Sequence, residues 1–331
     1  MGYLENLWIC LPYILVLFTF AGLILLRIIR KFKELGYIWN ELLIFGCFVT
    51  VGLFFPIMAE IPEWTILLQM LVFGGLLIIP LIEYLQIRKW TKECEFEKID
   101  ERDYETFIKQ FPEEYSSDRD IRRKLYHVLI PIIVVVGYSI GLYLLGGASI
   151  GRFIIFNIGF ALVTLFTLGD LLRLYNFKYL PGWGVQLFTS AMKKKELRSY
   201  SSPPGTIVAI AIFFILPFPI FASVAMLIGV SDSMASLVGK NYGKRFLKVG
   251  SDKKVEGTIA GVVVGIVSTL ALCFVFRPDW VWYASILLAL TAGGVFALFD
   301  YIDHPTINDN LSVPIVAGLL MWLIAYGFGL L

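Results

Sequence analysis

Charged residues are scarce in this 331-residue chain, since Asp, Glu, Lys and Arg make up only 16% of it. Soluble domains average about 25% charged residues, so a soluble globular protein is not expected. Cysteine is also rare, and Cys10, Cys47, Cys94 and Cys273 form no CxxC pair. We therefore expect neither a disulfide framework nor a zinc site. The sequence also has no low-complexity segment and no convincing internal repeat, and its first apolar segment lacks the basic leader of a cleavable signal peptide.

Apolar residues dominate instead, at 58% of the chain. Stretches near the roughly 20 residues that a membrane-spanning helix needs recur along most of its length. The sequence therefore predicts an all-α fold, a polytopic transmembrane helical bundle of about ten spans. Prolines at Pro217-Phe218-Pro219 separate the sixth span from the seventh, with a re-entrant hairpin as the alternative. The predicted spans are about 7–26, 42–58, 64–87, 125–145, 152–170, 205–216, 220–238, 257–276, 280–299 and 312–330.

The distribution of basic residues predicts the orientation of these spans. If the basic loop that begins at Arg27 lies in the cytoplasm, alternating spans place 26 of the 28 Lys and Arg on that side. This bias is the positive-inside pattern, and it puts both termini on the opposite side. Merging the sixth and seventh spans would move the basic 240–254 segment outside, so the bias also favours two separate spans. We expect an integral protein of a prokaryotic plasma membrane or of the endoplasmic reticulum, with its active site facing the cytoplasm.

Polar residues are unevenly placed along the chain. The first spans carry few of them, whereas polar clusters recur at the cytoplasmic span ends after Arg119. We interpret 1–90 as an accessory transmembrane bundle, 91–118 as a cytoplasmic loop and 119–331 as the catalytic transmembrane core. Both bundles would share one membrane domain.

A single carboxylate, Asp232, lies within an apolar run, where an ionised group is costly and is a functional-site candidate by default. On a helix, Gly229, Asp232, Ser236 and Gly239 would share one narrow face. Asp232 would then point into the bundle near its cytoplasmic mouth. Mg²⁺ prefers carboxylate and phosphate oxygens, so a metal site is expected there.

A glycine-rich basic turn follows, Gly239-Lys240-Asn241-Tyr242-Gly243-Lys244. It is not a Walker A loop, which has four residues between its glycines and Ser or Thr after its Lys. Backbone amides and lysines in such a turn can nevertheless cradle phosphates, and a purely structural turn is the alternative. The next span opens with Lys253-Lys254-Val255-Glu256-Gly257, and its glycines at intervals of four indicate close packing of another helix.

Four further clusters lie at predicted cytoplasmic span ends. Each has a plain structural interpretation beside a functional one: a positive-inside flank, a helix-end ion pair, a lipid-headgroup contact or a polar turn. Arg123 and His127 are four residues apart and share a helical face that could hold phosphate. The clusters are Arg122-Arg123-Lys124-Leu125-Tyr126-His127, Asp170 with Arg173, Lys193-Lys194-Lys195-Glu196-Leu197-Arg198, and Asp300 through Asp309-Asn310.

These pieces together resemble the CTP-dependent polyprenol kinase family, which includes dolichol kinase, phytol kinase and CTP-dependent diacylglycerol kinase. The family looks related to the phosphatidate cytidylyltransferases, whose long signature is absent here. The resemblance covers about 119–331, and one departure is Asp300, where a Glu is expected. The matching pieces are Arg123-Lys124-x-x-His127, Asp170-x-x-Arg173, Glu196, Asp232 with Gly239-x-x-x-Gly243-Lys244, Lys254-x-Glu256-Gly257 and Asp309-Asn310-x-x-x-Pro314.

The resemblance implies an integral-membrane kinase that transfers the γ-phosphate of CTP, with Mg²⁺, to an isoprenoid alcohol. Dolichol or a polyprenol is the expected acceptor, with phytol or geranylgeraniol as further acceptors and no nucleic-acid partner. Asp232, Glu196 and Lys254 are the expected catalytic residues, and Asp232 and Asp309 the expected metal ligands. The expected nucleotide-binding residues are Arg123, Lys124, His127, Gly239, Gly243, Lys244, Lys254, Glu256, Gly257, Asp309 and Asn310. Other site candidates are Asp170, Arg173, Arg198 and Asp300.

Two other classes of function stay open. A cytidylyltransferase would make a CDP-lipid and release pyrophosphate rather than CDP. A transporter of an anionic substrate would suit the helix break near Pro217 and the intramembrane Asp232. Against a transporter, the polar groups gather on one side of the membrane instead of at its midplane.

Overall fold

The computed structural model describes residues 3–31, 38–58, 65–93, 102–111, 117–192, 196–302 and 308–331. Within these ranges the chain is helical, and its β structure is limited to one isolated bridge. The long helices are α1 (Tyr3–Lys31), α2 (Ile38–Met58), α3 (Thr65–Lys92), α6 (Ser117–Ser139), α7 (Ala148–Tyr175), α12 (Val255–Phe276), α13 (Trp282–Ile302) and α14 (Asp309–Gly327). The shorter ones are α5 (Tyr104–Gln110), α8 (Gly182–Ala191), α9 (Ser202–Ala211), α10 (Phe218–Met226) and α11 (Asp232–Tyr242).

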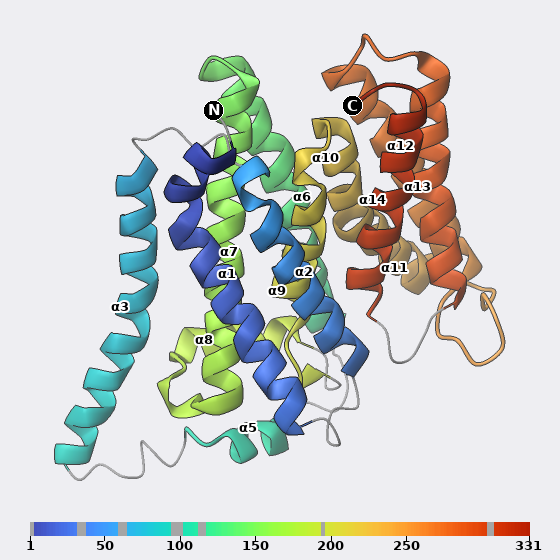
Figure 1. Cartoon of the computed structure of the whole chain (residues 1–331). Coiled ribbons are helices and arrows are strands. Elements are labelled where there is room, and N and C mark those ends of the chain that lie inside the picture. The colour runs from blue at the N-terminus through green and yellow to red at the C-terminus, as the bar shows by residue number, and fades with distance from the viewer. Residues whose placement is uncertain are drawn as a thin grey trace.

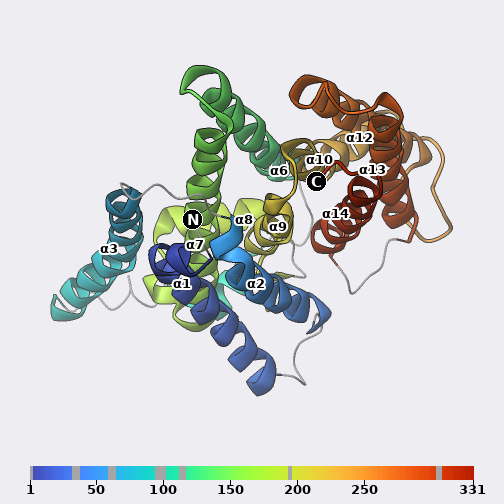
Figure 2. The ribbon, with the colours of Figure 1, turned by 45° about the horizontal axis from the view of Figure 1, so that its top comes forward.

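Each of the ten predicted spans coincides with a helix or a run of helices. Eight of these segments are long and apolar enough to cross a membrane, and Ser202–Ile215 is a shorter apolar helix. In Figure 1 both ends of the chain lie at the same end of the bundle, as an even number of crossings requires. Turned toward one end, Figure 2 shows α12, α13 and α14 grouped at one side of the bundle and α1 and α2 at another. The predicted fold class, an all-α polytopic membrane protein, is confirmed.

The break between the sixth and seventh predicted spans occurs where the prolines predict it. A 3₁₀ turn, η4 (Ile212–Ile215), ends the α9 segment, and Pro217 occupies the N-cap of α10. Helix ends leave backbone carbonyls without helical partners, and these groups must be satisfied within a membrane. The Arg152 guanidinium donates to the carbonyl oxygens of Phe214 at 3.1 Å and Leu216 at 2.9 Å. Arg152 on α7 therefore caps the break from a neighbouring helix.

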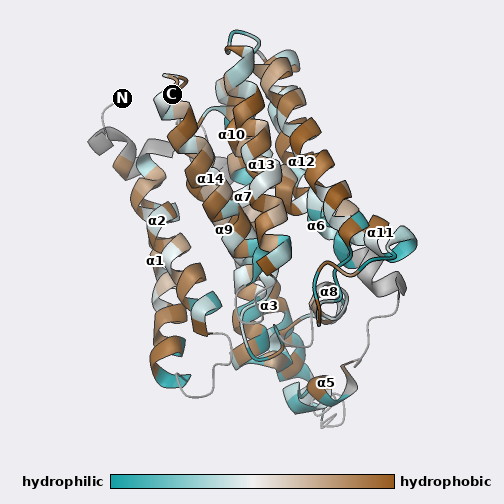
Figure 3. Cartoon of the chain, turned by 90° about the vertical axis from the view of Figure 1, so that its right-hand side faces the viewer, coloured by the Kyte–Doolittle hydropathy of each residue, from teal (hydrophilic) through white to brown (hydrophobic). Residues whose placement is uncertain are grey.

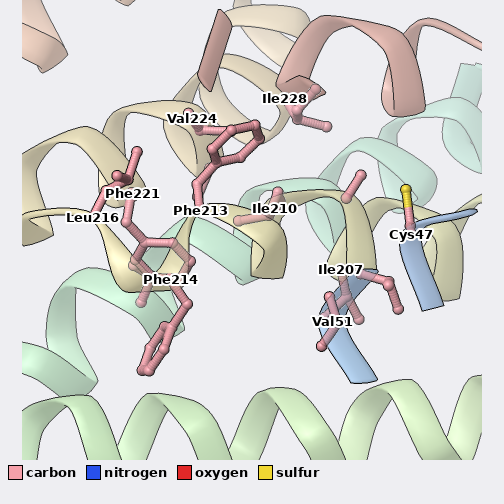
Figure 4. Close-up of a cluster of buried hydrophobic side chains, with 14 of the residues drawn as sticks. Cys47, Val51, Ile207, Ile210, Phe213, Phe214, Leu216, Phe221, Val224 and Ile228 are labelled. Atoms are coloured by element: carbon pink, nitrogen blue, oxygen red, sulfur yellow. The ribbon is translucent and has the colours of Figure 1, made fainter. Parts of the chain in front are cut away.

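Aromatic packing joins the first two helices to the rest of the bundle. Tyr13 of α1 lies against Phe55 of α2 at 4.9 Å and against Phe160 of α7 at 4.5 Å between ring centroids. Aromatic pairs in this distance range add to the free energy that burial itself contributes. Figure 4 shows Val51 of α2 beside Ile207 of α9 in the same apolar core.

A π-helical turn, η5 (Leu227–Ser231), immediately precedes Asp232 in the continuous helical segment Phe218–Tyr242. Such turns interrupt α-helices mostly as single insertions, often at functional sites. Gly229 lies within this turn and packs against α6, where a Cβ atom would lie 2.5 Å from Pro131 Cγ and 2.6 Å from the His127 carbonyl oxygen. The turn thus brings the start of α11 close to α6, while Gly229 faces that helix.

The segment between α11 and α12 folds back on itself as a small hairpin. The Leu247 amide donates to the Lys253 carbonyl at 2.9 Å, and Gly250 at the tip has a φ of +80°. The Glu256 carboxylate accepts from the backbone amides of Lys244 at 3.1 Å and Arg245 at 3.3 Å. Glu256 therefore fastens the hairpin to the first turn of α12.

Candidate active site

A polar cavity of about 380 Å³ opens at the end of the bundle opposite the termini, between α6, α11, the hairpin, α12, α13 and α14. Figure 3 shows hydrophilic segments gathered at this end, around α11 and the hairpin, below helices that are mostly hydrophobic. The cavity brings together nine of the predicted site residues: Arg123, Lys124, Asp232, Gly239, Gly243, Lys254, Asp300, Asp309 and Asn310. It also gathers residues that were not predicted for the site: Ala235, Ser236, Lys240, Asp252, Lys253, Thr258 and Asn308.

Asp232 forms an ion pair with Lys124, which joins the start of α11 to the start of α6. Lys124 is buried, with its ammonium also 3.4 Å from the Asp232 carbonyl oxygen. The Asp232 side chain keeps 37% of its surface exposed, so its carboxylate remains accessible from the cavity. Asp232 thus has a fixed position and an open face, as a ligand-binding carboxylate requires.

Lys253 binds two carboxylates from different helices. Its ammonium lies 3.0 Å from an Asp300 oxygen and 3.1 Å from an Asp309 oxygen. Burial alone would lower the pKa of Lys253, but the two carboxylates outweigh burial and raise this pKa above its ordinary value. Thr258 also donates to Asp300. Lys253 therefore remains a cation at neutral pH and draws the ends of α13 and α14 to the hairpin.

Lys254, the residue after Lys253, crosses the glycine turn at Gly243. A Cβ atom on Gly243 would lie 2.5 Å from Lys254 Cγ, so only glycine leaves room for this side chain. The Lys254 ammonium stacks on the Phe246 ring, 3.0 Å from its centroid. The hydrocarbon stem of Lys254 therefore runs along the cavity wall, and its charge can reach a ligand by leaving one exposed ring.

Four predicted residues lie at the edge of the cavity or behind its wall. Lys244 is exposed and contributes its backbone amide to Glu256, whereas Gly257 is buried in the α11–α12 contact. Neither Lys244, Glu256 nor Gly257 is among the residues that line the polar cavity. His127 is buried and lines an adjacent apolar cavity together with Arg123.

Glu196 lies in a separate small cavity next to the polar one. It accepts a hydrogen bond from Ser202, whose oxygen in turn accepts from the Asn308 side chain at 2.6 Å. The Asn308 amide donates to the Asn40 side chain of α2 at 2.8 Å. Asn308 also lines the polar cavity, so these hydrogen bonds connect Glu196 and the N-terminal helix α2 to that cavity. Neither Glu196 nor Asn40 lines the polar cavity itself.

Asp170 and Arg173 form a fully buried ion pair outside the polar cavity. Arg173 also donates to the carbonyl oxygens of Leu197 at 2.7 Å and Ser199 at 2.5 Å. Asp170 accepts from both the amide and the hydroxyl of Ser201. The pair therefore fixes the 197–201 segment that precedes α9.

The N-terminal helices hold the same segment from the other side. Glu41 of α2 accepts from the Tyr200 amide at 3.0 Å and pairs with Arg27 of α1. Arg27 donates to the carbonyl oxygen of Arg198, whose own side chain is exposed. The site candidate Arg198 thus takes part through its backbone.

Replacing Arg173 by Met should destabilise the protein, because Asp170 would remain as a buried charge without its partner. Removing one member of a buried pair costs about 3–5 kcal/mol. The double variant Asp170→Leu/Arg173→Met should recover part of this loss. Thermal unfolding of the wild type, the two single variants and the double variant in detergent measures the coupling energy between the two residues. A wild-type unfolding temperature for Arg173→Met would show that the pair does not support the fold.

Sequence reasoning missed several residues that the cavity gathers, and the signals for them were weak. Lys253 and Asn308 belong to clusters that the sequence singled out, but neither was named as a site residue. Lys240 and Asp252 lie on or near the basic turn. Residue type and position did not distinguish Lys253 and Asn308 from flanking charges and turn residues, and nothing local to Asn40 suggests a contact at the far end of the chain.

The residues of the cavity fit a magnesium ion that arrives with a nucleotide. Among the described residues, no three Asp, Glu, His or Cys side chains are grouped closely enough to hold a metal by themselves. The cavity does contain the carboxylates of Asp232 and Asp309. Mg²⁺ usually takes one or two protein carboxylates and completes its shell with water and substrate phosphates. Asp232 and Asp309 are therefore the residues that would hold it.

Comparison with known proteins gives relatives of one kind. The chain is similar to CTP-dependent diacylglycerol kinase 1 of Saccharomyces cerevisiae, at 25% identity over 63% of this chain and 74% of that protein. It is also 25% identical to CTP-dependent diacylglycerol kinase 1 of Schizosaccharomyces pombe, over 64% of this chain and 96% of the relative. A shorter match, 37% identical, covers 31% of this chain and 18% of the dolichol kinase EVAN of Arabidopsis thaliana.

No family model matches the chain, and no solved structure matches it significantly. The relatives nevertheless bear the names that the motif resemblance predicted, and their matches extend over most of the chain in two cases. The resemblance inferred from the motifs is therefore confirmed: this chain is a homologue of the CTP-dependent lipid kinases, the group that contains CTP-dependent diacylglycerol kinase and dolichol kinase.

Proposed function

We propose that this protein is a membrane kinase that transfers the γ-phosphate of CTP to the hydroxyl of a membrane lipid. The observation that carries the proposal is the polar cavity, where Asp232 and a group of Lys and Arg side chains meet at one end of an apolar bundle. Such a place can receive a water-soluble phosphate donor while remaining next to the hydrocarbon of the bilayer. The kinase names of the relatives support the same function.

The chemistry that this cavity suits is phosphoryl transfer, which depends on positioning and on charge neutralisation more than on covalent catalysis. The acceptor hydroxyl oxygen would attack the γ-phosphorus, the bond from that phosphorus to the bridging oxygen would break, and CDP would leave. The cations that line the cavity can neutralise the charge that develops on the phosphate oxygens. They are Arg123, Lys124, Lys240, Lys253 and Lys254.

The hydroxyl proton needs an acceptor close to the reacting atoms. Asp232 is the candidate, because its carboxylate lines the cavity and remains partly exposed. Glu196, the other carboxylate expected in this role, lies in the neighbouring small cavity and is better placed to position Asn308 through Ser202. A bound Mg²⁺ would supply further neutralisation of the phosphate charge. Asp232 and Asp309 would hold it.

The acceptor that we propose is a primary hydroxyl on a long apolar lipid. An isoprenoid alcohol such as dolichol, a polyprenol, phytol or geranylgeraniol has this chemistry, and so does diacylglycerol. The diacylglycerol kinases match over the larger share of the chain, whereas a dolichol kinase gives the higher identity over a short stretch. Both acceptor classes therefore belong in the test.

The test uses purified protein in mixed micelles with Mg²⁺ and CTP labelled at either the α or the γ phosphate. We expect label from the γ position in the lipid product and stoichiometric CDP, with dioleoylglycerol and a long polyprenol as the two acceptors. Transfer of α label with release of pyrophosphate would make the protein a cytidylyltransferase. No transfer to any lipid, combined with uptake of an anion into proteoliposomes, would favour a transporter.

The proposed orientation places the polar cavity on the cytoplasmic side, as the positive-inside bias predicts. Two exposed positions report opposite ends of the bundle, Val249 at the hairpin and Pro278 between α12 and α13. In a background in which Cys94 is replaced by Ser, Val249→Cys should react with an impermeant maleimide only from the cytoplasmic side. Pro278→Cys should react only from the other side. Labelling of both from one side would contradict this orientation.

A further inference from the structure

Two apolar cavities lie beside the polar one, within the bundle. One, of about 70 Å³, is lined by Arg123, His127 and apolar residues of α6, α7, α8 and α9. The other, of about 90 Å³, lies deeper and is lined entirely by apolar residues of α1, α2, α6, α7, α9 and neighbouring segments. Cavities lined by apolar side chains favour hydrocarbon over water, as an engineered apolar cavity of about 150 Å³ that accepts benzene shows.

The two apolar cavities adjoin each other, and the shallower one adjoins the polar cavity. Ile130, Ile133, Leu162 and Ile207 line both apolar cavities. Arg123 lines both the shallower apolar cavity and the polar one. The three cavities therefore form a series of neighbours from the cluster of cations at the bundle end into the apolar interior.

We call the two adjoining apolar cavities together the groove. Along α6 it extends from Arg123 to Val134, eleven residues, which corresponds to about 16 Å of helix. Aromatic rings line its deep end, among them Phe55, Phe160 and Phe221. Figure 4 shows Phe214 and Phe221 near this end, with Ile207 and Val51 farther along. The small volumes of the two cavities, about 90 and 70 Å³, suit a single hydrocarbon chain rather than two.

The shallow end of the groove also borders the bilayer. Tyr126 and Leu129 line it and are respectively 41% and 49% exposed on the lipid-facing side of α6. A chain could therefore enter from the side, between α6 and Leu187 of α8, without passing through water.

We propose that the groove between α6, α7 and α9 binds one hydrocarbon chain of the acceptor lipid and delivers its hydroxyl to Arg123 and Asp232. This inference rests on the proposed function and adds the acceptor site to it. A single-chain isoprenoid alcohol fills the groove with its only chain, whereas diacylglycerol inserts one acyl chain and leaves the other in the bilayer. In both cases the hydroxyl reaches the boundary between the apolar and polar cavities.

The test fills the groove at Gly159, which lines the deep cavity on α7 and where a Cβ atom would meet nothing within 4 Å. Gly159→Leu adds side-chain volume where the chain would lie. The matched control is Gly294→Leu on α13, where a Cβ atom also meets nothing within 4 Å and the position is exposed on the bundle surface. Acceptor kinetics are measured as surface mole fraction, with dioleoylglycerol against dihexanoylglycerol and a long polyprenol against geraniol.

We expect Gly159→Leu to raise the KM of the long-chain acceptor at least about tenfold, since several buried methylene groups lose their site. The KM of CTP and the kinetics of the short acceptor should stay near wild type, and Gly294→Leu should resemble wild type throughout. Gly159→Ala should give a smaller change of the same kind, and it serves as the test if the Leu variant does not fold.

Two results would overturn the groove. One is wild-type acceptor kinetics in folded Gly159→Leu, and the other is an equal loss with long acceptors, short acceptors and CTP. If the wild-type protein phosphorylates none of the four acceptors, the proposed kinase function itself fails, and this outcome is distinct from a failure of the groove.

Discussion

Replacing Asp232 by Asn should abolish lipid phosphorylation, with kcat lowered by at least about 10²–10³-fold. Loss of one preorganised electrostatic group in an active site has an effect of this size. Asn keeps the shape of the side chain but removes the charge that pairs with Lys124 and that would bind Mg²⁺. The kcat of purified Asp232→Asn, measured at saturating CTP and acceptor, gives the result.

The matched control is Asp279→Asn, which makes the same chemical change just after α12, at the end of that helix away from the polar cavity. Asp279 is exposed there and pairs with Arg277. It should leave kcat near wild type. Since Asp232 also joins α11 to α6, the folded state of each variant needs to be checked by thermal unfolding. The double variant Lys124→Gln/Asp232→Asn removes the whole pair and should fold even if the single variant does not. Near-normal turnover in folded Asp232→Asn would assign the metal to Asp309 instead.

The fold was predictable because its determinants are local. Apolar runs of membrane-spanning length and the prolines near Pro217 locate the long helices to within several residues and the break before α10, whereas the short helix α8 was not predicted. The π-turn Leu227–Ser231 was not predicted, since no residue in it differs from those of an ordinary apolar helix. The turn coincides with the close contact of Gly229 with α6, which only the packed bundle provides.

Which residues form the site was partly predictable, but which of them contact each other was not. Polar clusters at the same end of different spans must meet on one side of the membrane, and this placed Asp232, Lys254 and Asp309 in one region. Which groups then contact each other depends on helix packing. Asp232 forms an ion pair with Lys124, 108 residues earlier in the chain, and the Lys253 ammonium donates to Asp309, 56 residues later.

The contribution of the first helices was missed for the same reason. Asn40 binds the backbone of Asn308 across 268 residues of sequence, and Glu41 binds the Tyr200 backbone across 159. Asn40 therefore helps to hold a residue that lines the polar cavity, and Glu41 helps to hold the segment that precedes α9. We interpreted residues 1–90 as an accessory bundle. Their helices contact the core through the polar side chains of Asn40 and Glu41 as well as through the aromatic rings of Tyr13 and Phe55.

Replacing Lys254 by Gln should lower kcat/KM for CTP by about ten- to a hundredfold and leave the KM of the lipid acceptor nearly unchanged. Loss of one charge-assisted hydrogen bond to a phosphate costs about 1.5–3 kcal/mol, which corresponds to that range of rate. Lys254 lines the polar cavity, and its stem is held against the glycine turn at Gly243. The expected loss is therefore specific to the nucleotide.

The matched control for Lys254 is Lys89→Gln on α3, which removes the same charge from an exposed position outside the cavity. If Lys254 acted only as one of the 26 basic residues on the proposed cytoplasmic side, both variants would keep wild-type kinetics. If it bound lipid headgroups, Lys254→Gln would raise the KM of the acceptor instead of that of CTP. A selective effect on CTP in Lys254→Gln, absent from Lys89→Gln, is the result that places this lysine on the triphosphate, because only a contact made in the cavity distinguishes the two charges.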